Sequence, residues 1–285
     1  MKNIKTILGI IVLYKTKLEE SETFKSLRNS LDSCNYKNEL TLLIFNNSPE
    51  YWEYKGENYK GIEIIYHHDS SNPGVSKAYN LGYKHAEKMN KDYVLTLDQD
   101  TVLNKSFFKN FFYAEKKYKD KNINIFCSRM KYGEKLVSPS IFSFFLKNRA
   151  MKGIEEGLHQ LKGLAVINSG LFVSVKLVKK IGGYNEKIKL DFSDFDFLKR
   201  AEKYVNEIVV LDNNCGHMLS GEEKLPRDKV LTRFSFYIEG AKYYNKTFFQ
   251  SIGVFIWVFL RSIKLGITHN TFDFTFLFFR KIIKK

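Results

Sequence analysis

The sequence is poor in proline and cysteine for a chain of 285 residues. Only four prolines occur and no Ser/Gly-rich linker divides the chain, so we expect one compact unit followed by a C-terminal extension. Three cysteines (Cys34, Cys127 and Cys215) are odd in number and far apart, which argues against a disulfide framework or a zinc ribbon. This cysteine usage favours a reducing, cytoplasmic compartment.

Acidic residues are in the minority, with 31 Asp+Glu against 46 Lys+Arg and a net charge of +15. Such an excess favours anionic partners, namely nucleic acid, phosphorylated ligands or an anionic membrane surface. Lysines scattered along the chain are equally consistent with a solvated surface. Because no nucleic-acid-binding motif is recognisable, we predict no nucleic-acid partner.

The N-terminus lacks the small-residue cleavage site of a signal peptide. A basic start is followed by the apolar run Ile7–Leu13, and then by Tyr14, Lys15, Thr16 and Lys17. We therefore interpret Ile7–Leu13 as a buried first strand.

Short β-rich runs alternate with helical patterns over the first 130 residues. The predicted strands are Ile7–Leu13, Leu40–Phe45, Ile62–Tyr66, Tyr93–Leu97 and Ile123–Cys127, with helices at Glu19–Leu31, Ser76–Met89 and Ser106–Lys117. This alternation predicts a Rossmann-like α/β fold with a mostly parallel sheet and flanking helices. Met130–Lys152 is interpreted as irregular, and Leu164–Val175 as a strand pair.

Two carboxylates, Asp98 and Asp100, directly follow the apolar strand Tyr93–Leu97. Ligands of open α/β sheets bind beyond the carboxyl ends of the strands, and hard divalent cations prefer oxygen ligands. The pair therefore indicates a metal that bridges a sugar diphosphate, although a turn capped by aspartates would show the same pattern. His217, after a later strand, is a candidate nitrogen ligand or a structural histidine.

Three further carboxylates, Asp191, Asp194 and Asp196, lie within six residues before a predicted helix. A carboxylate at such a helix start can take a proton from an attacking hydroxyl, or it can simply cap the helix. We take Asp194 as the general base and keep Asp191 and Asp196 as alternatives.

A glycine, Gly74, precedes the helix predicted at Ser76–Met89, where the backbone could approach a ligand closely. The segment is neither a Walker loop nor the Gly-x-Gly-x-x-Gly element of dinucleotide-binding enzymes. A plain turn with a helix cap remains the alternative.

Together these segments resemble glycosyltransferase family 2, the inverting enzymes of GT-A fold, and in particular its rhamnosyltransferase-like branch. The similarity runs from Ile7 to about Gly221. In chain order, the segments that carry it are Ile11–Tyr14, Asn72–Gly82, Tyr93–Thr101, Asn168–Phe172, Gly182–Glu186, Asp191–Arg200 and His217.

The resemblance implies roles for these positions. Asp98, Asp100 and His217 would hold Mg²⁺ or Mn²⁺, and Asp194 would deprotonate the acceptor. The donor-binding residues would be Tyr14, Asn46, Asn72, Gly74, Lys77, Asn80, Asp98, Ser169 and Gly170. The family often carries an aspartate after its second strand to hold the nucleobase, whereas this chain has Asn46 or Asn47 there, so the nucleotide preference is open.

The C-terminal part differs in composition from the rest. Residues 1–225 are expected to form the catalytic domain, with a nucleotide-sugar half to about residue 130 and an acceptor half at 131–225. Residues 226–285 combine apolar runs such as Phe248–Leu260 with basic residues. We expect helices that lie on the cytoplasmic face of a membrane, with packing on the domain or homodimer formation as alternatives.

These features predict a metal-dependent enzyme that moves a sugar from a dTDP- or UDP-type donor to a glycan or lipid-linked acceptor in cell-surface polysaccharide synthesis. The resemblance suggests rhamnose as the sugar. The alternative is a non-catalytic nucleotide-sugar or glycan binder of the same fold.

Overall fold

The computed structural model describes residues 5–34, 40–52, 62–142, 148–149, 151–217, 225–244 and 247–283. The end of the family resemblance, residues 218–221, lies outside this part of the chain, as do residues 143–147 and 150 of the segment interpreted as irregular.

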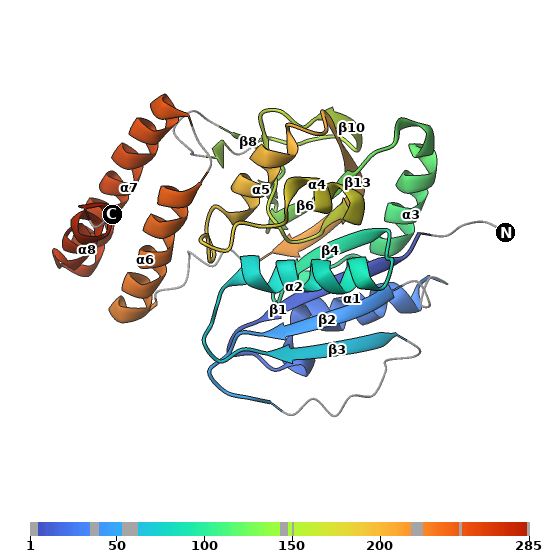
Figure 1. The fold of residues 1–285 in the computed structure, drawn as a ribbon, viewed down its shortest axis with the longest axis horizontal. Helices are drawn as coiled ribbons and strands as arrows, with labels where there is room; N and C mark the ends of the chain where they lie inside the picture. The colour runs from blue at the N-terminus through green and yellow to red at the C-terminus, as the bar shows by residue number, and fades with distance from the viewer. Residues whose placement is uncertain are drawn as a thin grey trace.

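A mixed sheet of ten strands forms the centre of the molecule (Figure 1). Its main path runs in the order β10-β13-β6-β12-β4-β1-β2-β3. These strands are β1 Ile7–Leu13, β2 Leu40–Asn46, β3 Glu63–His68, β4 Tyr93–Asp98, β6 Ile125–Tyr132, β10 Gly157–Gln160, β12 Leu171–Ser174 and β13 Glu207–His217. β1 pairs in parallel with both β2 and β4, and β2 with β3, which confirms the α/β prediction for the N-terminal half.

Helices cover both faces of this sheet. One face packs against α1 (Glu22–Asp32) and α3 (Phe107–Lys117) through a first apolar cluster. The other packs against α2 (Val75–Lys88), α4 (Val175–Ile181) and α5 (Ser193–Ala201) through a second cluster. Both faces of the central strands are apolar because both are buried, which explains the continuous hydrophobic run of β1.

The segment interpreted as irregular contains strands instead. β6 extends to Tyr132 and forms a hairpin with β7 (Lys135–Ser138), and β8 (Ser140–Phe142) follows. The prediction that Leu164–Val175 forms two strands paired with each other is also wrong. β11 (Leu164–Ala165) joins β8 in a small second sheet with β9 (Asn148–Arg149), whereas β12 enters the main sheet antiparallel between β4 and β6. Which strands pair cannot be inferred from local hydrophobic periodicity when the partners are distant in sequence.

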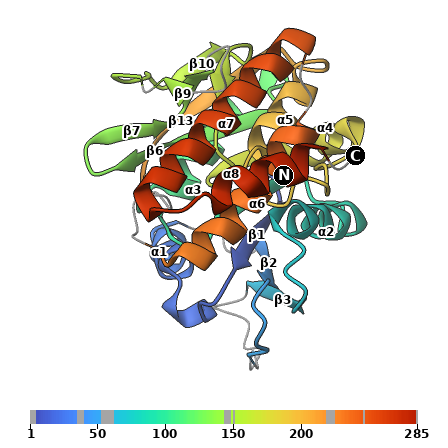
Figure 2. The ribbon, with the colours of Figure 1, turned by 90° about the vertical axis from the view of Figure 1, so that its left-hand side faces the viewer.

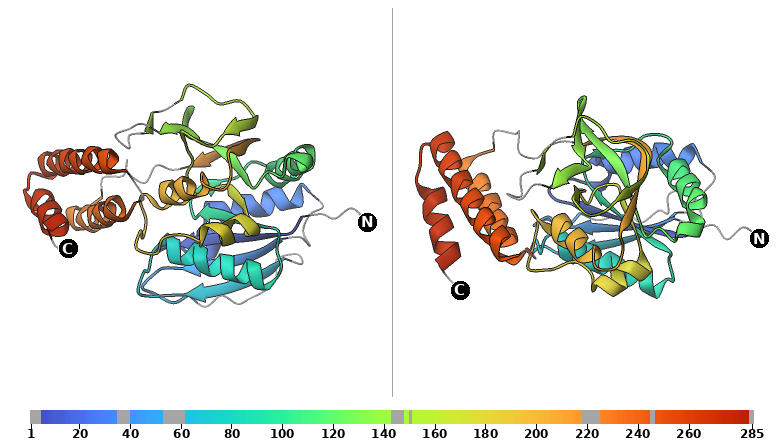
Figure 3. Two further views of the ribbon diagram at one scale, coloured as in Figure 1. Left: turned by 45° about the horizontal axis from the view of Figure 1, so that its top comes forward. Right: turned by 90° about the horizontal axis from the view of Figure 1, so that it is seen from above.

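The C-terminal extension is helical, as expected. It consists of α6 (Arg227–Tyr243), α7 (Phe248–His269) and α8 (Asp273–Ile283), which stand together at one side of the domain (Figures 1 and 3). A third apolar cluster holds these helices together. It includes Ile188 and Phe192 of the loop before α5, so the extension shares its core with the α/β domain.

Candidate functional site

The carboxylates Asp98 and Asp100 lie at the carboxyl end of β4, as predicted, and His217 ends β13 beside them. The two segments are joined by β5 (Thr101–Val102), whose Thr101 pairs with His217. Ligand atoms of Asp98, Asp100 and His217 all lie within 4.8 Å of one another, and each residue is partly exposed. Residues 98, 100 and 217 are thus brought to one point.

A hydroxyl network supports this cluster from behind. Thr101 Oγ1 lies 2.6 Å from Ser169 Oγ and 3.3 Å from His217 Nδ1. Ser169 Oγ also accepts a hydrogen bond from the Asp98 amide at 3.1 Å. Ser169 is buried, so in this structure it orients the carboxylate strand and the histidine ring.

Gly170 allows this network to pack closely. Its φ is +71°, a region that side chains rarely adopt, and a Cβ atom there would lie 2.2 Å from Met130 Cε. The Gly170 amide donates to Thr96 O at 2.9 Å, which fixes the Ser169 turn against β4. The hydrogen bonds at this turn explain the serine at position 169, and the positive φ with the close packing explains the glycine at position 170.

The three residues fit a hard or borderline divalent cation. Two carboxylates supply oxygen ligands and one imidazole supplies nitrogen, a donor set that suits Mn²⁺ and, through its oxygens, Mg²⁺. The partial exposure of all three residues leaves room for further ligands, such as phosphate oxygens or water.

Asp194 lies in the first turn of α5, where its Oδ1 accepts a hydrogen bond from the Phe195 amide at 2.8 Å. Burial raises the pKa of Asp194 to about 7, and the nearby charges of Asp191 and Asp98 add to the rise. Ser193, the neighbour of Asp194, accepts a hydrogen bond from Asn168 at 3.0 Å, and Asn168 precedes the Ser169 that bonds the Asp98 amide, so the start of α5 lies next to the turn that holds Asp98. A carboxyl group with a pKa close to neutrality can accept and release a proton under ordinary conditions.

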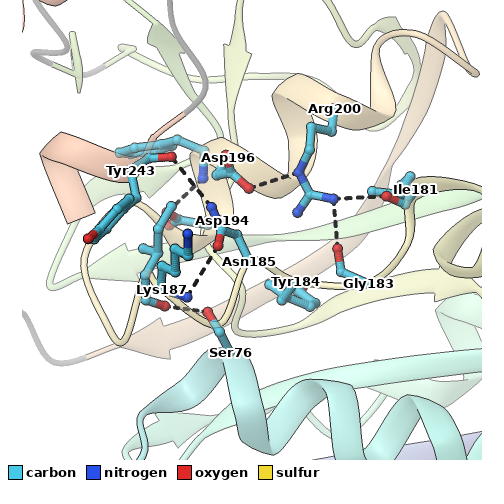
Figure 4. Close-up of polar contacts among 12 residues, drawn as sticks. Ser76, Ile181, Gly183, Tyr184, Asn185, Lys187, Asp194, Asp196, Arg200 and Tyr243 are labelled. Atoms are coloured by element: carbon cyan, nitrogen blue, oxygen red, sulfur yellow. Dashed lines mark hydrogen bonds and ion pairs between the residues drawn. The ribbon is translucent and has the colours of Figure 1, made fainter. Parts of the chain in front are cut away.

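The alternative base, Asp196, forms an ion pair with Arg200. It is 1% exposed, and Arg200 Nε donates to its Oδ2 at 2.8 Å (Figure 4). The same guanidinium donates through Nη1 to the carbonyls of Ile181 and Gly183 at 3.0 and 2.7 Å. Asp196 therefore ties α5 to the turn that follows α4.

The other alternative, Asp191, faces the C-terminal extension. Arg233 on α6 lies 3.8 Å from its Oδ1, and its Oδ2 is buried without a hydrogen-bond partner in the described part of the chain. Gly240 of the same helix packs so closely that a Cβ atom would lie 2.3 Å from the Asp191 carbonyl. Phe192, in left-handed conformation with φ +75°, packs its ring against Tyr237 with centroids 4.9 Å apart.

The loop that leads to Asp194 is also held from the other side by the start of α2. The Val75 amide donates to Lys189 O at 2.8 Å, and the Ser76 hydroxyl donates to Ile188 O. Gly74 has φ +96°, and a Cβ atom there would lie 2.3 Å from Lys189 O. Gly74 thus allows a close approach to protein backbone.

The polar residues predicted around α2 bond to protein groups. Asn80 accepts from the Tyr184 amide at 2.7 Å and donates to Glu186 at 2.8 Å. Lys77 forms an ion pair with Asp69 at 3.0 Å. Hydrogen bonds from Ser71, together with this ion pair, lower the pKa of the Asp69 carboxyl. Asn72 lies beside them with φ +49°.

Near the ends of β1 and β3 lies a cavity of about 370 Å³. Its lining consists of Leu13, Lys17, Leu18, Glu19, Tyr51, Trp52 and Tyr66. Asn46 is fully buried and donates to the Tyr66 hydroxyl at 2.9 Å, so it positions one wall. Asn47 is buried too, and its Oδ1 has no hydrogen-bond partner among the described residues. The exposed Tyr14 donates its amide to Gln99 at 2.7 Å.

Two tyrosines were missed by the sequence reasoning. The buried Tyr79 donates to Asp98 Oδ1 at 3.3 Å, and burial raises its pKa well above 10. The buried Tyr184 donates to Asn168 Oδ1 at 3.0 Å and stacks on Phe197 at 4.3 Å. A tyrosine in an apolar helix stripe looks like ordinary core, so only the fold reveals that the Tyr79 hydroxyl meets the carboxylate.

The structure thus places two carboxylates and a histidine that could hold a divalent cation at the carboxyl ends of the strands, and a carboxyl group of near-neutral pKa on α5. The chain belongs to glycosyl transferase family 2, whose family model matches residues 10–177. No curated protein sequence gave a significant match.

Solved structures of glycosyltransferases share this fold. S. aureus TarS 1–349 in complex with UDP-GlcNAc is 16% identical with a TM-score of 0.57, over 92% of this chain and 73% of that one. A longer TarS structure is 17% identical with a TM-score of 0.56, and the match spans 88% of this chain but only 42% of that one. GalNAc-T7 with UDP, GalNAc and Mn²⁺ is 10% identical with a TM-score of 0.56, over 99% of this chain and 57% of that one. Such low identities show a common GT-A fold alone.

Proposed function

We propose that this protein is a metal-dependent, inverting hexosyltransferase that acts on a nucleotide-diphosphate sugar. The observation that carries the proposal is the convergence of Asp98, Asp100 and His217 at one point, together with Asp194 on α5, a carboxyl group with a pKa of about 7. Ligands for a cation and a group that accepts protons at neutral pH are the two requirements of inverting sugar transfer.

Asp194 would act as the general base. It would take the proton from an acceptor hydroxyl as that oxygen attacks the anomeric carbon from the side opposite the diphosphate. In-line attack of this kind inverts the configuration at that carbon. A bound Mg²⁺ or Mn²⁺ would supply positive charge to the diphosphate as the nucleotide leaves.

The nucleobase would occupy the cavity lined by Tyr51, Trp52 and Tyr66, because aromatic rings offer stacking surfaces to a base. Its 370 Å³ lie near the end of β1, and β1 is the immediate neighbour of β4, which carries the metal ligands. The TarS 1–349 and GalNAc-T7 structures contain UDP-GlcNAc and UDP respectively, which supports a pyrimidine-nucleotide donor of UDP or dTDP type. Rhamnose is the sugar that the sequence resemblance favours, with a glycan or lipid-linked acceptor in cell-surface polysaccharide synthesis.

The first test is a thermal-shift panel of UDP, dTDP, GDP and their sugars, each with Mn²⁺, Mg²⁺ or a chelator. A ligand that binds only the folded state raises the melting temperature, so one nucleotide class should stabilise the protein and lose its effect with the chelator. A flat response to every donor would contradict the proposal. Stabilisation without turnover of any sugar would favour the non-catalytic binder.

A pair of variants separates the metal site from the base. Asp100→Ala should weaken the metal-dependent shift, because a charged ligand of the cation is lost. Asp194→Asn should keep this shift, since it leaves the cluster intact. Equal loss of donor binding in both variants would argue against separate roles.

A further inference from the structure

The outer faces of α7 and α8 carry apolar side chains that nothing in the described structure covers. On α7 the exposed side chains are Phe248, Ile252, Phe255, Ile256, Leu260, Ile263 and Ile267. They recur every three or four residues and so form one stripe along the helix. On α8 the exposed side chains are Phe276 and Phe279, and Phe272 directly before the helix is exposed too.

These two stripes form one continuous surface, which we call the outer apolar face. Phe259 of α7 packs against Phe279 of α8 with centroids 5.8 Å apart, and Phe255 packs against the buried Phe278 at 5.1 Å. Figure 2 looks straight at the side of the molecule where α6, α7 and α8 lie. Apolar patches of this extent are uncommon on soluble monomers and mark an interaction site.

The opposite side of α7 is fixed to the protein. Val254 and Val258 are buried in the third apolar cluster, and Trp257 Nε1 donates to the Tyr237 hydroxyl of α6 at 3.1 Å. Arg261 stacks over the Tyr237 ring at 4.1 Å. One face of α7 is therefore packed against α6, and the opposite face points outward.

The C-terminal extension, residues 226–285, carries a strong excess of positive charge. Residues 226–285 contain eleven Lys and Arg but only three Asp and Glu. Two of the three acids are already engaged, because Asp273 pairs with Arg227 and Glu239 with Lys281. Lys264 borders the apolar stripe of α7, and the exposed Arg280 follows Phe279 on α8. An apolar face bordered by cations is complementary to anionic lipid.

We propose that the outer apolar face docks on an anionic lipid bilayer, with α7 and α8 lying in the plane of the membrane surface. By length and composition one helix of the described chain, at Gln250–His269, could span a bilayer, with 20 residues and a mean hydropathy of 1.5. Spanning would, however, force the charged helix α6 and the attached catalytic loop into hydrocarbon, since α7 is packed against them. Docking in the plane buries the exposed stripe and leaves these contacts intact.

Sedimentation with lipid vesicles, without any nucleotide sugar, tests the docking independently of the proposed transfer reaction. The full chain should sediment with vesicles that contain phosphatidylglycerol and much less with phosphatidylcholine alone. The double variant Ile256→Glu/Phe276→Glu should bind about tenfold or more weakly, because two charges enter the apolar face. Both side chains are exposed, at 45% and 70%, so the fold should survive.

Tyr113→Glu is the matched control, because Tyr113 is 66% exposed on the distant helix α3. It should bind vesicles like the unmodified protein. Equal binding by the double variant would overturn the proposal. So would a soluble dimer that the double variant converts to monomers, which would assign the face to a second copy, or a protein that alkaline carbonate cannot extract, which would indicate a spanning helix.

Discussion

Two carboxylates that are two residues apart in sequence have different environments. Burial, with smaller contributions from the charges of Asp191 and Asp98, raises the pKa of Asp194 to about 7. Asp196 is neutralised by Arg200, at 2.8 Å, in a buried pair. The first is suited to proton transfer, and the second to holding α5 in place.

Asp194→Asn should reduce turnover by at least about a hundredfold, since general-base catalysis contributes on the order of 10²–10⁴. In the unmodified enzyme turnover should fall as the pH drops below about 7, because the protonated carboxyl group cannot accept a proton. Initial rates of nucleotide release across this pH range check both expectations. Turnover of Asp194→Asn at the unmodified level would exclude this residue as the base.

Asp196→Ala should instead destabilise the protein by about 3 kcal/mol, because it leaves the partly buried guanidinium of Arg200 without its carboxylate partner. Chemical denaturation measures this free energy of unfolding.

The variant Asp194→Asn serves as the comparison for Asp196→Ala. The folded-state pKa of Asp194 is raised, so the carboxyl group favours folding at low pH and this contribution is lost as the pH rises through about 7. Above pH 7 the Asn variant should therefore be at least as stable as the parent. An unchanged unfolding free energy in Asp196→Ala would show that the pair adds nothing.

Tyr51→Ala should weaken nucleotide binding about tenfold, since stacking of a base on an aromatic ring is worth about 1–3 kcal/mol. Tyr51 lines the cavity near β1 and is 63% exposed, so its loss should not disturb the core. Calorimetric titration with UDP and dTDP measures the effect, and Tyr113→Ala on α3 is the control. Equal affinities in both variants would place the nucleobase elsewhere.

Among the elements, the loop before α5 shows how the base is positioned. The start of α2 holds it through Lys189 and Ile188, and α6 holds it through Asp191 and Phe192. The loop has no regular secondary structure of its own, so its conformation depends on these two neighbours. The C-terminal extension therefore contributes directly to the site.

Gly240→Ala should lower turnover by about tenfold or more while the helices remain folded. Local helix propensity alone would make alanine favourable by about 1 kcal/mol, but its Cβ would lie 2.3 Å from the Asp191 carbonyl. α6 must then move away from the loop that carries Asp194. Rates, together with circular dichroism, check this, and Thr232→Ala at an exposed position of α6 is the control. Normal turnover in Gly240→Ala would show that the loop does not depend on α6.

At the scale of the molecule, the catalytic domain and the extension share the third apolar cluster. Ile188 and Phe192 from the domain pack with Phe234, Phe274 and other side chains of α6–α8. The predicted boundary at residues 225/226 therefore marks a change in amino-acid composition, but one apolar core extends across it.

The chain should consequently unfold in a single cooperative transition. Scanning calorimetry should give one peak, and near-UV and far-UV circular dichroism should report the same midpoint. Two separate transitions would show that residues 226–285 form an independent unit. The vesicle experiment should use the full chain for the same reason.

The amino-acid sequence by itself determined the main strands and helices of the N-terminal half and the place of Asp98 and Asp100 at a strand end. Buried parallel strands are continuously apolar, and helices repeat every three or four residues, so both leave local patterns. The family's motifs indicated Asp194 and His217 in the same way.

Tertiary structure alone decided which side chains meet. The pairing of β12 between β4 and β6, the hairpin after β6, and the contact of Tyr79 with Asp98 join residues that are distant in sequence. Such contacts leave no periodic trace, because each is set by the packing of whole elements against one another.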